Sequence, residues 1–313
     1  MRRLSIASLA AASSLLSGGI ALDYAKQSDT VATSAAHSFP INKLRTARES
    51  SSDLEVGGEL AGLSPGLTRY ITREDLLTFP QVTYTVSDDS NFAGPTKIGG
   101  VPLEMLAKSL GAAPQADMVV AICDDKYRAN YPREYVAEHH PLLVLTVNGQ
   151  PPSGWPKDPG GHGYDMGPYL ISHPEFKPSS KFSHADVPQI PWGVVRIEFR
   201  DENTVFGTIA PRAAYAASLQ VMAGYRIAQQ DCFRCHNMGH EGGRKSGIPW
   251  LVLSALATAS PEYFSAYVRD PKSKNSHAEM PGNSSYNDVT IGSLIAYFRT
   301  FSSHSLHASQ GNP

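Results

Sequence analysis

The sequence predicts two domains, an α+β domain followed by a small all-α domain. Its 313 residues suffice for two domains of ordinary size. Residues 61–205 mix short apolar strands with short helices and lack the regular strand–helix alternation of a parallel sheet. From residue 210 to about residue 303, apolar residues recur at helical spacing. We therefore expect an α+β domain over 61–205 and an all-α domain over 210–303.

The N-terminus has the pattern of an export signal. Two arginines precede the apolar stretch Leu4–Leu16, and small residues follow it. A membrane anchor is the alternative, but an anchor needs about 20 mostly apolar residues, and serines and glycines interrupt this segment. We expect residues 1–25 to be a signal peptide, removed near Ala21 or Ala25. The mature protein would then be periplasmic or otherwise exported, with no transmembrane segment.

Capping and turn residues mark the elements of the expected α+β domain. Residues 26–60 are rich in Ser, Ala and Thr, and we expect a flexible lead-in there. Thr72, with an acidic residue three positions later, predicts a capped helix that ends at Pro80. The segment 103–110 has one apolar helical face and is closed by Gly111. Apolar or alternating segments predict strands over 82–86, 118–122, 142–147 and 194–199.

Helical spacing continues through residues 210–303. Pro211 suits the first position of one helix. A second helix would begin after Ser260 as N-cap. A third, within 287–301, has apolar residues at i, i+3, i+4 and i+7. Residues 304–313 are expected to form a flexible tail.

Composition and cysteine usage exclude several classes of protein. The hydrophobic content of 41% and the formal net charge of −2 fit a globular protein without the basic excess of a nucleic-acid binder. An exported protein enters an oxidising compartment, yet three cysteines allow only one disulfide, and two of them are three positions apart. The fold is therefore not a disulfide scaffold, and the close cysteine pair needs another explanation.

The cysteine pair belongs to the sequence Cys232-Phe-Arg-Cys235-His236. A thioredoxin-like dithiol would lie after a strand in a βαβ unit, whereas this pair follows a helical segment. A structural zinc site needs four ligands, and the sequence has no second cysteine pair. Haem attachment uses all three residues, since both thiols form thioethers and the histidine binds the iron. We favour one covalently attached haem c over the zinc and dithiol alternatives, which stay open.

A haem iron in an electron carrier usually takes a second axial ligand. Met280, followed by a Pro-Gly turn, is our choice for that ligand, and His277 is the alternative. Met238 and His240 follow the attachment motif too closely to cross the macrocycle. A methionine ligand favours ferrous iron and would raise the reduction potential relative to two histidines.

Residues 215–303 resemble a class I c-type cytochrome. The resemblance is carried by "AGYRIAQQDCFRCHNMGHEGG", "GIPW", "MPGN" and "LIAYF". It implies that the Pro249 carbonyl accepts a hydrogen bond from the haem histidine, which would fix the ring. It also implies that Gly224 lies against the last helix near Tyr297. We further expect an apolar haem pocket that includes Leu251, Leu294 and Phe298.

The upstream region resembles, more faintly, the molybdopterin-binding domain of sulfite-oxidase-like enzymes. The matching stretches are "TREDLLTFP", "VTYTVSDDSNF", "IGGVPLEMLAKSLGA", "VVAICDDKYRANYPREYV" and "VVRIEF". In those enzymes a cysteine shortly after the first strand binds the metal, but here that stretch reads Val86-Ser87-Asp88-Asp89. Cys123 lies later and does not match. Without the thiolate ligand, we expect a relative of the family that binds no molybdenum cofactor.

These observations favour an exported monohaem c-type cytochrome that carries single electrons between redox partner proteins, rather than a stand-alone catalyst. The alternative is a haem-containing oxidoreductase whose N-terminal domain binds a molybdenum cofactor or a small substrate and passes electrons to the haem. Molybdenum content and turnover with sulfite distinguish the two. A third possibility, a haem-based sensor, requires a dissociable Met280. Basic residues near the motif would suit an acidic partner; they are Arg234, Arg244, Lys245, Lys272 and Lys274.

Overall fold

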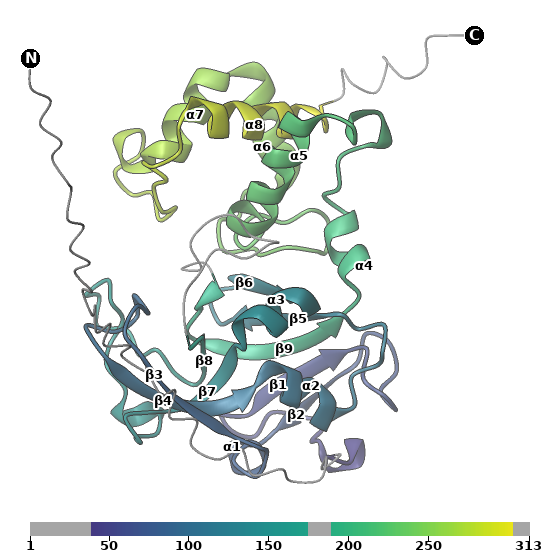
Figure 1. The fold of residues 1–313 in the computed structure, drawn as a ribbon, viewed down its shortest axis with the longest axis vertical. Coiled ribbons are helices and arrows are strands. Elements are labelled where there is room, and N and C mark those ends of the chain that lie inside the picture. The colour runs from purple at the N-terminus through teal and green to yellow at the C-terminus, as the bar shows by residue number, and fades with distance from the viewer. Residues whose placement is uncertain (1–38, 175–188, 303–313) are drawn as a thin grey trace, which may run out of the picture. The chain divides into compact units, whose positions relative to one another are not determined.

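The computed structural model (Figure 1) describes residues 39–174 and 189–302, all of which lie within the unit Ser34–Pro313. These described residues form two β-sheets and eight α-helices, so the fold class is mixed α+β. The predicted signal peptide, residues 1–25, and the predicted tail, residues 304–313, lie outside the described residues.

Five strands form the first sheet, in the order β2 (Thr68–Ile71), β1 (Leu54–Gly58), β9 (Val194–Arg200), β5 (Met118–Cys123) and β6 (Arg128–Pro132). The β1–β9 pair is parallel and the other pairs are antiparallel. Strand β9 buries Ile197 and Phe199 on one face, as its alternation predicts. The alternation therefore places Arg196, Glu198 and Arg200 together on the other face.

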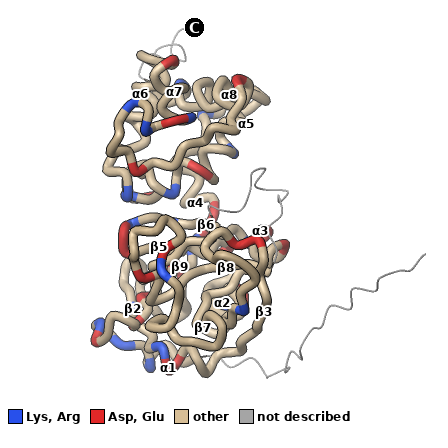
Figure 2. Tube along the Cα trace, turned by 90° about the vertical axis from the view of Figure 1, so that its left-hand side faces the viewer, with Lys and Arg blue, Asp and Glu red and all other residues tan. Residues whose placement is uncertain are grey.

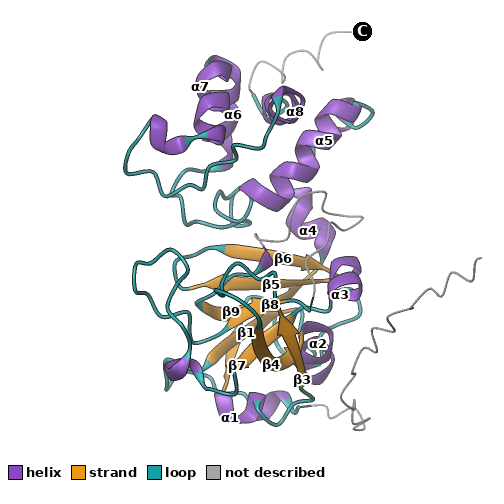
Figure 3. Ribbon diagram, turned by 60° about the vertical axis from the view of Figure 1, so that its left-hand side comes forward, coloured by secondary structure: helices purple, strands orange, loops and turns teal. Residues whose placement is uncertain are grey.

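Four antiparallel strands form the second sheet, in the order β3 (Val82–Val86), β4 (Thr96–Pro102), β7 (Leu142–Val147) and β8 (Leu170–Ser172). Helix α2 (Leu103–Leu110) follows β4 directly, and α3 (Arg133–His139) follows β6. Figure 3 shows both helices beside the strands. Their buried residues share one hydrophobic cluster with strands of the first sheet.

Local sequence signals set several of these boundaries as expected. Helix α1 (Arg73–Leu76) begins where the Thr72 hydroxyl accepts a hydrogen bond from the Asp75 N–H at 3.0 Å. Helix α2 ends at Gly111, whose φ of 73° is left-handed and favours glycine. Strands β3, β5, β7 and β9 lie on the four predicted segments.

Five helices follow the last strand: α4 (Glu202–Gly207), α5 (Leu219–Ile227), α6 (Trp250–Ala259), α7 (Pro261–Arg269) and α8 (Asp288–Arg299). Helices α5 and α8 cross at Gly224. A Cβ there would lie 2.1 Å from the Ser293 carbonyl oxygen and 2.7 Å from the Tyr297 Cβ, so the crossing requires a glycine. The expected approach of Gly224 to the last helix and Tyr297 is confirmed.

The prediction of an α+β domain followed by a separate all-α cytochrome c domain is wrong. The described residues form one unit of mixed class. Met118 and Val120 of strand β5 belong to the same hydrophobic cluster as Phe233, Trp250 and Phe298 of the helical region. The physical reason is that helical periodicity shows that a helix has an apolar face but does not show what covers that face. Here, residues of strand β5 in the first sheet cover part of the apolar faces of the helices.

Several helices and strands were not predicted from the sequence, or were placed differently. Strand β1 lies inside the stretch 26–60 that was expected to be a flexible lead-in. Helix α5 begins after the Ser218 cap, later than Pro211. The elements without a sequence prediction were β1, β2, β4, β6, β8, α3, α4 and α6. Within the described ranges, no helix is long and apolar enough to span a bilayer.

Candidate functional site

Cys232, Cys235 and His236 lie on one tight turn after helix α5. A π-helical turn, Ala228–Cys232, extends the helix to the first cysteine. The N–H groups of Cys235 and His236 then both donate to the Cys232 carbonyl, at 3.1 and 3.0 Å. The chain thus brings the two thiols and the imidazole together within one turn, at the end of a helix whose last turn is widened.

The two motif thiols are unpaired, and their surroundings favour the protonated form. All three cysteines of the chain are described and unpaired; Cys123 is buried, and the motif pair is partly exposed. Burial is the main cause that raises the pKa of both Cys232 and Cys235 above the ordinary thiol value. Because a redox dithiol depends on a lowered thiol pKa, this environment disfavours the dithiol alternative.

His236 is buried and oriented by the backbone. Its Nδ1 donates a hydrogen bond of 2.7 Å to the Ile248 carbonyl and lies 3.0 Å from Ser246 Oγ. Burial lowers the pKa of His236, although the Ile248 bond opposes that shift. Because the carbonyl can only accept, Nδ1 carries the hydrogen, and the neutral form of the ring has its lone pair on Nε2. This is the tautomer that a metal-binding histidine with a carbonyl partner presents.

The acceptor for His236 is Ile248, one residue before the predicted Pro249. The Pro249 carbonyl accepts instead from the Val252 N–H at 2.9 Å, which closes the first turn of α6. A carbonyl committed to a helix turn points along the helix axis. The carbonyl one residue earlier is therefore the one that reaches the ring, and the hydrogen bond expected of Pro249 is corrected to Ile248.

Apolar side chains are exposed at the start of α6, shortly after the Ile248 carbonyl that binds His236. Leu251 is 56% exposed and Val252 is 42% exposed at the start of α6, while the Trp250 N–H bonds the Asn237 carbonyl at 2.7 Å. Helix α6 is apolar on nearly all sides, which is typical of a helix covered on all sides. Exposed apolar side chains so soon after the Ile248 carbonyl are compatible with a large apolar group such as a haem. Leu294 and Phe298, also expected in this pocket, are buried in the core cluster.

The predicted axial ligand Met280 lies between a short 3₁₀ turn, Pro271–Ser273, and helix α8. Its side chain is partly buried against the same hydrophobic cluster. Just after it, the Asn283 N–H bonds the Val268 carbonyl at 3.0 Å. The alternative ligand His277 is exposed. The choice of Met280 stays a prediction.

The segment after the motif folds back onto it. The Gly243 N–H donates to the Phe233 carbonyl at 2.8 Å, and a Cβ at Gly243 would lie 1.6 Å from the Arg234 carbonyl oxygen. The Met238 and Glu241 backbones bond each other at 2.9 and 3.1 Å. Backbone bonds thus hold Met238 within this loop. Met238 is a residue that the sequence analysis excluded as a second ligand because it follows the motif too closely.

Two of the basic residues expected to form a docking rim are paired. Arg234 forms an ion pair with Asp231, and Lys245 forms one with Asp125. Arg244 is exposed, as are Lys272 and Lys274. Figure 2 shows both acidic and basic residues in the part of the chain that carries α5 to α8. The basic excess around the motif is therefore smaller than the sequence indicates.

The stretch Val86-Ser87-Asp88-Asp89, which lacks the cysteine expected from the resemblance, holds a buried carboxyl. Asp89 accepts a hydrogen bond from the Asn91 N–H at 2.8 Å and another from the Ser172 hydroxyl. Burial raises the pKa of Asp89, although these bonds oppose it. Among the described side chains, no group of three or more His, Cys, Asp or Glu residues is arranged to hold a metal ion.

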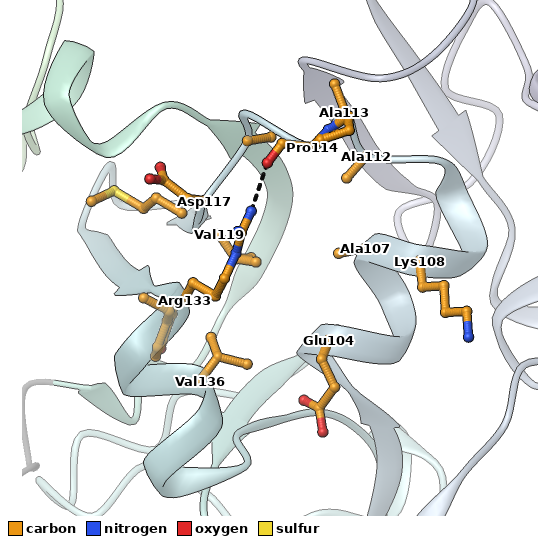
Figure 4. Close-up of a pocket in the computed structure, with 13 residues that line it drawn as sticks. Glu104, Ala107, Lys108, Ala112, Ala113, Pro114, Asp117, Val119, Arg133 and Val136 are labelled. Carbon is orange, nitrogen blue, oxygen red and sulfur yellow. Dashed lines mark hydrogen bonds between the residues drawn. The ribbon is translucent and has the colours of Figure 1, made fainter.

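A pocket of about 300 Å³ lies between α2, α3 and the loop that joins α2 to β5. Figure 4 shows small apolar residues along it and Arg133, which donates to the Pro114 carbonyl at 2.7 Å. A second pocket, of about 470 Å³, is lined in part by Arg196, Glu198 and Arg200. Neither pocket includes a cysteine or a predicted site residue.

Comparisons with known proteins do not define a family for this chain. No family model matches the chain, and no curated protein matches it. Among solved structures, the chain is similar to the sulfane dehydrogenase SoxCD from Paracoccus pantotrophus, at 18% identity and a TM-score of 0.34. The match covers 50% of this chain and 40% of that one, so the chain spans well under two thirds of its neighbour. A TM-score this low leaves the family undefined.

Proposed function

We propose that this chain is an electron carrier with one haem c, bound through thioethers to Cys232 and Cys235. The observation that carries the proposal is the turn itself. It holds two free thiols next to a neutral imidazole, whose Nδ1 is fixed by the Ile248 carbonyl at 2.7 Å. That arrangement suits covalent haem attachment with Nε2 toward the iron.

Bound haem supplies a single-electron Fe(III)/Fe(II) couple. The chain's own part is to attach, orient and shield that group. His236 would be one axial ligand, with its orientation set by Ile248. The exposed apolar side chains of Leu251 and Val252 would cover one face of the macrocycle and exclude water. Met280 would be the second ligand, which leaves no open position for a substrate and favours electron transfer.

The proposal includes an exported location and separate redox partners. The signal pattern in residues 1–25 supports export, and haem attachment of this kind takes place on exported chains with reduced thiols. Two of the basic residues near the motif are neutralised by ion pairs. We therefore expect the docking of partners to depend only weakly on ionic strength.

The number of thioether bonds between the haem and the chain tests this proposal. The chain, produced with its N-terminus intact and with haem-attachment machinery present, should give a pyridine haemochrome spectrum of a doubly attached haem. Cys232→Ala and Cys235→Ala should each shift the band toward that of a singly attached haem. The double variant should lose all covalent haem, whereas the Cys123→Ala control should keep it. Wild-type protein without covalent haem would refute the proposal.

A further inference from the structure

The attachment loop (residues 231–246) is bonded to the β5–β6 hairpin turn (residues 123–128). The Arg128 N–H donates to the Arg234 carbonyl at 3.0 Å, and the Arg244 N–H donates to the Lys126 carbonyl at 3.1 Å. The ion pair of Lys245 with Asp125 adds a third link. The loop and the hairpin turn are thus hydrogen-bonded to each other, although more than 100 residues separate them in sequence.

Arg234, inside the Cys-x-x-Cys motif, is also held by the hairpin turn. Its Nη1 donates to the Tyr127 hydroxyl at 2.9 Å, and its guanidinium lies 5.8 Å from the centre of the Tyr127 ring. On its other side it pairs with Asp231, which also accepts a hydrogen bond from the Tyr286 hydroxyl. A residue between the two cysteines is therefore fixed by a tyrosine of the β5–β6 hairpin turn.

Glu241 carries the strongest electrostatic link between the loop and the sheet. Its carboxylate lies 2.7 Å from Arg128 of β6 and 2.5 Å from Arg200 of β9. Arg128 is 5% exposed and Glu241 is 11% exposed. Beyond Arg200, the charges continue along β9 to Glu198 at 3.0 Å. Charge-assisted bonds in such a buried place are stronger than surface pairs, and an unpaired partner is costly.

We propose that Tyr127 and Glu241 are positioning residues through which the sheet sets the orientation and the charge environment of the haem attachment turn. The proposal rests on the proposed function, because it assigns the sheet region a role at that same site. The sheet acts as the rigid base of the loop. The Glu241 carboxylate balances Arg128 and Arg200 five residues after His236.

Glu241→Gln keeps the shape of the side chain and removes its charge. The buried Arg128 and the partly exposed Arg200 then lose their shared counter-charge, although Glu198 still pairs with Arg200. The net charge near the attachment turn becomes more positive. A more positive surrounding disfavours ferric iron, so the reduction potential rises. The same change loosens the loop. Backbone exchange within residues 233–244 should become at least about tenfold faster, which corresponds to the loss of one charge-assisted hydrogen bond.

The experiment compares Glu241→Gln and Tyr127→Phe with Glu262→Gln and Tyr263→Phe, which change exposed residues of α7. Hydrogen exchange and the reduction potential are measured on each full-length holoprotein. We expect faster loop exchange in both test variants, a raised potential in Glu241→Gln, and neither effect in the controls. A potential and an exchange rate in Glu241→Gln equal to those of Glu262→Gln would overturn the proposal.

The exchange measurement also separates this proposal from the proposed function. Loop exchange can be followed on the chain with or without haem, because the bonds to the hairpin turn involve protein groups alone. Wild-type protein that carries no haem, but whose loop exchange responds to Glu241→Gln, refutes the electron-carrier proposal and keeps the anchoring by the sheet. If the wild-type protein carries haem but its loop exchange does not respond to Glu241→Gln, the electron-carrier proposal stands and the anchoring by the sheet is refuted.

Discussion

The two segments that would flank a bound haem are held in very different ways. The attachment loop, residues 231–246, is fixed by backbone bonds to the hairpin turn and by buried ion pairs to two strands. The segment with Met280, residues 274–285, has mostly exposed side chains and bonds chiefly to its own neighbours and to the end of α7. The first segment depends on long-range contacts and the second on local ones.

This difference predicts which changes are tolerated. Substitutions in the attachment loop disturb contacts with the sheet, so they should lower the stability of the whole unit. Substitutions around Met280 leave the packed core intact and should change only the properties of the haem iron. The attachment loop and the segment with Met280 should therefore differ most in how strongly a substitution lowers the free energy of unfolding.

Gly243→Ala should be severely destabilising. Its Cβ would lie 1.6 Å from the Arg234 carbonyl oxygen, so the loop could no longer fold back onto the motif. We expect the free energy of unfolding to fall by about 3 kcal/mol or more, because only a backbone shift relieves the clash. Denaturant unfolding measures this. Gly207→Ala, where a Cβ would meet no atom within 4 Å, is the control, and equal losses in both variants would contradict the account.

Acid should weaken the attachment loop through Glu241. Burial alone would raise the pKa of this carboxyl, but Arg128 and Arg200 hold the pKa below the ordinary value of 4.5. The unfolded chain therefore binds the proton more readily. The stabilisation is complete above about pH 4.5 and is lost as the pH falls through the lower folded pKa.

Urea unfolding of wild type and Glu241→Gln at several pH values checks this prediction. The gap between the two free energies of unfolding should be largest near pH 7 and should shrink as the pH falls below about 4.5. Glu262→Gln, an exposed carboxyl on α7, should show no such gap. A gap for Glu241→Gln that stays constant across this pH range would mean that its charge does not stabilise the loop.

Met280→Leu should have the smallest effect on stability and a clear effect on the iron. Met and Leu have similar volumes, so the free energy of unfolding should change by less than about 1.5 kcal/mol. Loss of the thioether should lower the reduction potential and allow the reduced protein to bind carbon monoxide. His277→Leu should change neither property. If His277→Leu instead allows the reduced protein to bind carbon monoxide, His277 is the axial ligand.

The sequence predicted best what depends on neighbouring residues. The Thr72 cap, the Gly111 helix end and four strands follow from local rules, and the structure bears them out. The approach of Gly224 to Tyr297 was also correct. Strand β1 was missed because it has few apolar residues and is stabilised by its partners β2 and β9.

The contacts between the attachment loop and distant strands could not be predicted. Nothing near Glu241 in the sequence indicates Arg128 or Arg200, which come from two different strands. One signal was present, since Arg196, Glu198 and Arg200 recur at period two and so mark a charged face of β9. The sequence does not show that Glu241 pairs with this face. The shift of the histidine's acceptor from Pro249 to Ile248 likewise depends on where α6 begins.

The intact mass of the purified mature chain under denaturing conditions tests the central claim most directly. Electron transfer by a covalently held haem predicts a mass equal to that of the polypeptide plus one haem, and a red protein whose spectrum changes on reduction. A colourless protein with the mass of the polypeptide alone, obtained from cells that attach haem to other chains, would contradict it.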